Sequence, residues 1–123
     1  MEKIKVLTTV EFEPQDIIDV LITALEGGSN YWYQFGDSNE GISKFTDKSL
    51  SECVGLSVLE KGAIVPIYDY EDENELLGTI SKENIERGLK LFIEDGRCFE
   101  PEMDAEDADI FFQFVVMGKI VFG

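Results

Sequence analysis

The sequence predicts a single α+β domain over residues 1–123, in which a small mixed or antiparallel sheet packs against about four helices. The 123 residues are the size of one ordinary domain, and no linker, repeat or low-complexity segment divides them. Hydrophobic residues make up 44% of the chain and include nine Phe, which is ample material for a core. Segments with helical periodicity alternate with a few short segments of strand character, as in α+β folds.

A strand is predicted over residues 4–12, because apolar or β-branched side chains recur there with a period of two. These residues are Ile4, Val6, Thr8, Val10 and Phe12. A helix is predicted from Pro14 to about Glu26, since Pro suits the first helical turn and apolar residues follow at helical spacing. We expect Gly27-Gly28 to end this helix, with one of the two glycines at positive φ.

Residues 30–35 are short and aromatic and are typical of a strand. A second helix is predicted over about residues 50–60. Ser49 and Glu52 form a possible capping box at its start, and Gly62 is expected to end it.

A hairpin is predicted next, with strands over residues 63–70 and 76–80 and an acidic tip between them. Pro66 indicates that the first of these strands lies at an edge or contains a bulge. Ser81 is expected to cap a third helix that ends at Gly96. Asp104 is expected to cap a fourth helix over residues 105–117, which Gly118 ends, and residues 119–123 form a possible final strand.

Charge is the strongest compositional signal, because 26 acidic residues against 10 basic ones give a net charge of −16. This charge opposes direct binding to nucleic acid or to anionic membranes and favours a partner protein with a basic surface. The alternative is that the acidity only keeps the protein soluble. The candidate binding residues lie in two clusters: Asp69, Glu71, Asp72, Glu73 and Glu75, and then Glu100, Glu102 and Glu106.

The sequence predicts no catalytic residue, no metal site and no cofactor. It contains no His, no phosphate loop and no dinucleotide fingerprint, so we expect a protein that is not an enzyme. The carboxylates near residue 106 lack the Gly and Glu of a calcium loop. Cys53 and Cys98 are expected to be reduced, and no signal peptide or membrane-length apolar stretch is found, which indicates the cytoplasm.

A second candidate binding region is the aromatic segment Asn30, Tyr31, Trp32 and Tyr33. Strand alternation would direct Tyr31 and Tyr33 to one side and Trp32 to the other. One side joins the core in this interpretation. The other could hold a flat, nucleotide-like ligand or contact a protein.

Two stretches of the chain, residues 16–32 and residues 104–123, resemble a group of small proteins encoded by bacteriophages and prophages. The specific parts are the run TALEGGSNYWY, which ends at Tyr33, and the C-terminal DAEDAD and MGKIVFG segments. Many members of that group carry Cys after the Trp, where this chain has Tyr33. The resemblance implies a phage or prophage setting, in which small accessory proteins often disable host complexes.

Two functional hypotheses remain open. In the first, the chain is a non-enzymatic acidic protein in the cytoplasm of the host bacterium that binds and inhibits a host protein involved in antiviral defence or nucleic-acid handling. In the second, it binds a small nucleotide-like ligand through residues 31–33. A homodimer is also possible, because the apolar residues 120–122 need cover.

Overall fold

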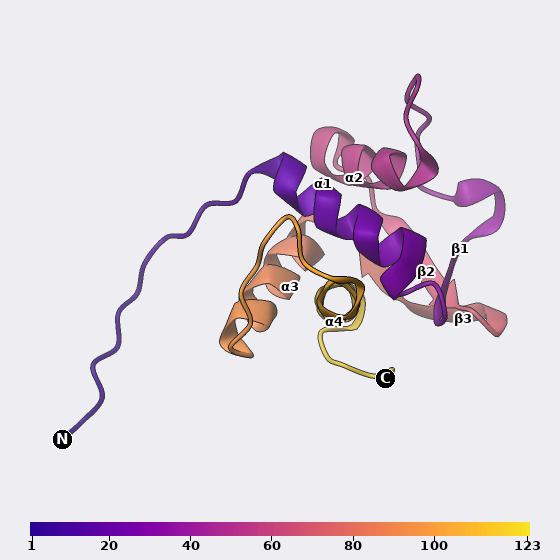
Figure 1. Cartoon of the computed structure of the whole chain (residues 1–123). Coiled ribbons are helices and arrows are strands. Elements are labelled where there is room, and N and C mark those ends of the chain that lie inside the picture. Colours follow the sequence, from indigo (N-terminus) through magenta and orange to yellow (C-terminus); the bar gives the residue numbers. More distant parts are fainter.

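Four α-helices and a three-stranded antiparallel sheet make up the computed structural model, which describes residues 1–123 (Figure 1). The helices are α1 (Pro14–Thr23), α2 (Leu50–Lys61), α3 (Lys82–Glu94) and α4 (Ala105–Met117). The strands are β1 (Tyr33–Phe35), β2 (Val65–Asp69) and β3 (Asp72–Ile80), with β2 in the centre of the sheet. The predicted α+β class is confirmed.

The predicted hairpin is present as β2 and β3, but its acidic residues are placed differently. Residues 72–75 belong to β3 and not to the loop, because the turn contains only Tyr70 and Glu71. Tyr68 pairs with Leu76 while the next residue, Asp69, pairs with Asp72, so residues 73–75 bulge out of the ladder. Pro66 lies in the central strand, at a position that the short β1 does not reach.

The N-terminal arm, residues 1–13, forms no strand, so the first predicted element is wrong. The arm runs away from the body as an extended segment (Figure 1). Its base is attached through Phe12, whose ring lies edge-on to Phe99 at 5.3 Å between centroids. The period-two pattern indicates strand propensity, but a strand also needs a neighbour, and the sheet ends at β1 and β3.

The end of the first helix also differs from the prediction. A π-helical turn, Ala24–Gly28, follows α1, and the N–H of Ser29 donates to the carbonyl oxygen of Ala24 at 2.8 Å. Neither Gly27 nor Gly28 has a positive φ, so the expected left-handed cap is absent. Gly28 is instead required by packing, because a Cβ atom there would lie 2.3 Å from the backbone oxygen of Ala105.

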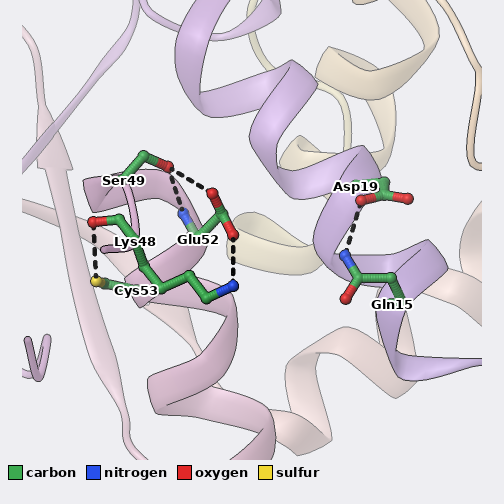
Figure 2. Close-up of polar contacts among 6 residues, drawn as sticks. All are labelled: Gln15, Asp19, Lys48, Ser49, Glu52 and Cys53. Atoms are coloured by element: carbon green, nitrogen blue, oxygen red, sulfur yellow. Dashed lines mark hydrogen bonds and ion pairs between the residues drawn. The ribbon is translucent and has the colours of Figure 1, made fainter. Parts of the chain in front are cut away.

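The other predicted helix ends are confirmed. Ser49, Ser81 and Asp104 each accept a hydrogen bond from the backbone N–H three residues later. Figure 2 shows the first of these caps, where Glu52 also accepts a hydrogen bond from the Ser49 hydroxyl at 3.5 Å. Gly62 and Gly118 adopt left-handed conformations, with φ of 65° and 73°.

One hydrophobic core holds the helices and the sheet together. Helix α4 lies at its centre, in contact with α1, α3, the π-helical turn and β3. Close approach is possible because Gly78 and Gly88 face α4, where a Cβ atom would collide with Val116 and Val115. None of the helices combines the length and apolar character needed to cross a membrane.

Candidate functional site

Asp109 joins the aromatic segment to helix α4. Its side chain is buried, with 8% of its surface exposed, although it belongs to a strongly acidic stretch. One carboxylate oxygen accepts hydrogen bonds from the Ser29 hydroxyl and the Trp32 indole N–H, each at 2.7 Å. The other accepts from the Tyr31 hydroxyl at 2.7 Å and from the Gln113 amide at 3.3 Å. The buried charge therefore has its hydrogen bonds satisfied.

Gln113, one turn further along α4, holds the C-terminal tail. Its side-chain oxygen accepts from the backbone N–H groups of Val121 and Phe122 at 2.8 and 2.9 Å, and its amide donates to the Phe122 carbonyl at 3.1 Å. The Phe122 ring stacks on Trp32 with 5.2 Å between centroids. The tail is thus bound by a side chain and not by a sheet, so the predicted final strand is wrong.

The four residues of the aromatic segment have different environments. Trp32 is only 2% exposed and lies between Phe112 and Phe122. The Tyr33 hydroxyl donates to the Leu25 carbonyl oxygen at 2.7 Å. Tyr31 remains 48% exposed, and Asn30 is exposed beside it. The expected alternation fails because β1 begins only at Tyr33, so residues 30–32 follow a turn.

Both tyrosines beside the core are poor acids. Burial raises the pKa of Tyr31 to about 12, and the hydrogen bond to Asp109 adds to the increase. Burial also raises the pKa of Tyr33 to about 12, with a further contribution from the charge of Glu26. Both phenols keep their protons near pH 7, so the Tyr31 O–H donates a hydrogen bond to the Asp109 carboxylate.

Two hollows open on either side of Tyr31 and Phe122. The smaller, of about 250 Å³, is also lined by Asp69, Tyr70 and Glu71 from the hairpin turn. The larger, of about 770 Å³, extends past Ile120 to Glu106 at the start of α4. The backbone N–H of Tyr70 donates to the Trp32 carbonyl oxygen at 2.9 Å, which fixes the turn beside the aromatic segment.

We call this region the aromatic–acidic face. Its apolar and aromatic lining includes Tyr31 and Phe122, which line both hollows, and Tyr70 and Ile120, which line one hollow each. Its rim carries carboxylates from both predicted clusters, namely Asp69, Glu71 and Glu106. The fold thus places part of each predicted acidic cluster next to part of the predicted aromatic segment.

The remaining acidic candidates lie elsewhere. Asp72, Glu73 and Glu75 are exposed along β3, and Glu73 lines a separate polar pocket with Asp37 and Glu40. Glu100 and Glu102 are exposed in the connection between α3 and α4. Figure 1 shows this connection and the tip of the hairpin on opposite sides of the body. The acidic candidates therefore do not form one continuous stripe.

Few carboxylates are neutralised by a neighbouring cation. Of the 26 acidic residues, only Glu52, Asp95 and Asp107 lie in an ion pair. Arg97 contacts both aspartates, at 2.8 and 3.0 Å. No group of three or more carboxylate or thiol side chains is arranged to hold a metal ion. The three carboxylates on the rim of the aromatic–acidic face therefore have no ion-pair partner within the chain.

No family model matches this chain. No curated protein and no solved structure gives a significant match either. The site must therefore be interpreted from its own geometry. In that geometry the segments 16–32 and 104–123 form one unit, connected through Asp109 and Gln113.

Sequence reasoning missed the role of Asp109, which belongs to the acidic stretch at the start of the fourth predicted helix. A signal was nevertheless present. Asp109 and Gln113 are four residues apart, so they share one side of a helix. Their neighbours on that helix are almost all apolar, and a polar pair in such a setting indicates a buried hydrogen-bond network.

Proposed function

We propose that this chain is a non-enzymatic binding protein that recognises a basic surface of a partner protein through the aromatic–acidic face. The observation that carries the proposal is the composition of that face. The exposed aromatic side chains Tyr31 and Tyr70 line it, and the carboxylates of Asp69, Glu71 and Glu106 that line it with them have no Lys or Arg partner within the chain.

This arrangement suits protein recognition for two physical reasons. Tyrosine is enriched among the residues that dominate binding energy, because it buries a large apolar surface and keeps a polar end. Unpaired carboxylates on the rim accelerate encounter with a basic surface and disfavour acidic partners. The excess of negative charge over the whole chain acts in the same direction.

The phage or prophage setting implied by the sequence resemblance suggests the kind of partner. Basic surfaces on bacterial proteins are commonly the places where nucleic acid binds. We propose that the partner is a cytoplasmic host protein that handles nucleic acid, such as a component of antiviral defence. Occupying its basic surface would inhibit it by excluding the phosphate backbone.

The nucleotide-like ligand is the second candidate, and the geometry supports it less. Trp32 is buried and Tyr33 is partly buried, so Tyr31 is the one aromatic ring of the segment that is exposed enough for a flat ligand to stack on it. A phosphate beside this face would meet carboxylates, and Arg97, the cation that lines the larger hollow, is already paired with Asp95 and Asp107.

The test begins with affinity capture from a host lysate and measures binding of the captured protein at two salt concentrations. The test variant is Glu71→Lys/Glu106→Lys, which reverses two rim charges. The matched control is Glu60→Lys/Glu83→Lys, which makes the same change in net charge on α2 and α3, away from both hollows. Glu83 and Glu106 both occupy the first turn of a helix, so their effects on folding should be similar.

We expect affinity to fall with salt, to fall about tenfold or more in the rim variant, and to change little in the control. Duplex DNA should compete with the protein for its partner. An affinity that is insensitive to salt, and equal in the rim and control variants, would contradict the proposal. Saturable binding of a free nucleotide that is lost in Tyr31→Ala would favour the second candidate.

A further inference from the structure

The N-terminal arm exposes a strand-like backbone without a partner. Residues 1–12 make no hydrogen bond with the rest of the chain, although they are extended. Their apolar side chains are open to solvent, with Ile4 93% and Val6 78% exposed. Unpaired N–H and C=O groups along an extended segment form a template for another strand.

The charges along the arm are arranged so that the arm is complementary to itself. Lys3 and Lys5 lie in its first half beside Glu2, and Glu11 and Glu13 lie in its second half. If two arms pair in antiparallel orientation about Thr8, Lys5 lies opposite Glu11 and Lys3 opposite Glu13. Parallel pairing in register would place like charges opposite each other, which is destabilising.

The same register also matches the apolar side chains. Ile4 falls opposite Phe12, and Val6 falls opposite Val10. Because side chains alternate along a strand, these four residues and Thr8 point to one face of the ribbon, with Glu2 at its end. The side chains of Lys3, Lys5, Glu11 and Glu13 point to the other face, together with Leu7 and Thr9. The apolar pairs and the ion pairs therefore occur in the same register, and a shift by one residue would lose both.

Helix α3 supplies a surface for the apolar face of this ribbon. A groove of about 470 Å³ lies between the arm and α3, and Thr8, Val10 and Phe12 line it on the arm side. Leu89 and Ile93 line it on the helix side, and Ile93 is 43% exposed. In the antiparallel register, Ile4 and Val6 of a second copy would lie beside Phe12 and Val10, over the open part of this groove.

We infer that two copies of this chain associate through antiparallel pairing of their N-terminal arms about Thr8, with the apolar face of the ribbon seated on α3 of each copy. A two-stranded ribbon alone is only marginally stable in water, so the contact with α3 is essential. The arrangement is a two-fold interface in which each copy uses the same residues.

A cross-linking experiment tests the register. Thr8→Cys is made in a Cys98→Ser background, because Cys98 is exposed and Cys53 is buried. Two residues at position 8 would face each other across the two-fold axis, with Cα atoms about 5 Å apart, within the range of a disulfide. The control is Thr9→Cys, whose two copies would be separated by more than about 7 Å.

We expect mild oxidation to produce a covalent dimer from Thr8→Cys and little from Thr9→Cys. Equal cross-linking of the two variants would overturn the register. Sedimentation of the wild-type chain as a monomer at every concentration up to its solubility limit would overturn the association itself.

A charge-exchange experiment tests the ion pairs with the full chain. Lys5→Glu and Glu11→Lys each place like charges opposite each other twice in the dimer, so each variant should dimerise about tenfold or more weakly than wild type. Mixing the two variants restores opposite charges, and so does combining both changes in one chain. The mixture and the double variant should each recover dimerisation. If neither recovers it, antiparallel pairing is refuted. Far-UV circular dichroism and Trp32 emission confirm that each variant is folded.

Discussion

Replacing Asp109 with Ala removes the acceptor that joins the aromatic segment to α4. The carboxylate accepts from two buried donors, the Ser29 hydroxyl and the Trp32 indole, and both lose their partner in the variant. Tyr31 is partly exposed and can turn its hydroxyl towards water. The cost therefore comes mainly from Ser29 and Trp32, and from the small cavity that Ala leaves.

The size of the effect follows from these contacts. A hydrogen bond to a charged group contributes about 1.5–3 kcal/mol, and a buried donor left without a partner costs about 1–3 kcal/mol. Two such donors give an expected loss of about 3–5 kcal/mol in the free energy of unfolding. That is a large share of the roughly 5–15 kcal/mol that stabilises an ordinary domain. For a chain of this length, the midpoint of thermal unfolding should fall by about 12–20 °C.

Urea unfolding followed by Trp32 emission measures this loss directly, because Trp32 is the one tryptophan and contacts Asp109. The matched control is Asp107→Ala, two residues earlier on α4. Asp107 pairs with Arg97 near the surface, so its loss should cost no more than about 1 kcal/mol. Equal losses in the two variants, or an unchanged emission spectrum for folded Asp109→Ala, would show that the network does not stabilise the fold.

Three further predictions use the same region. Gly28→Ala should lower the free energy of unfolding by about 1–3 kcal/mol, because the new Cβ would lie 2.3 Å from a backbone oxygen. Gly27→Ala is the control, since a Cβ there meets open space and should not destabilise the fold. Thermal melts of the two variants measure the difference. Gln113→Leu should release the C-terminal tail and increase acrylamide quenching of tryptophan emission, and no change in quenching would contradict this role. Stability should fall as the pH rises from about 10 to about 12. The folded chain holds the protons of Tyr31 and Tyr33 up to a pKa of about 12, while the unfolded chain releases them near 10.0, so Tyr33→Phe should flatten the decline in pH-dependent urea unfolding.

The helix ends show what could be predicted from the sequence. A cap depends on a hydrogen bond between residues three apart, so Ser49, Ser81 and Asp104 could be assigned without knowledge of the fold. The same holds for Gly62 and Gly118, whose left-handed conformation completes a local turn. The acidic composition and the α+β class also follow from the chain itself.

The site depended on contacts between distant parts of the chain. Asp109 binds donors 77 to 80 residues away, and although its spacing from Gln113 marks a polar pair on an apolar helix, no local pattern identifies those donors. Gly28 was interpreted as a cap, but its role comes from the approach of α4, which occurs only after folding. Trp32 is buried because Phe112 and Phe122 enclose it, and strand alternation was the wrong guide to its side.

The sequence by itself determined the N-terminal caps of α2, α3 and α4, the negative charge, and the strand-like pattern of the arm with its complementary charges, because these are properties of neighbouring residues. Tertiary structure alone decided that Asp69, Glu71 and Glu106 share a face with Tyr31, and that the arm has no partner within the chain. The physical reason is that hydrogen bonding and burial are satisfied between segments, and which segments meet depends on how the whole core packs.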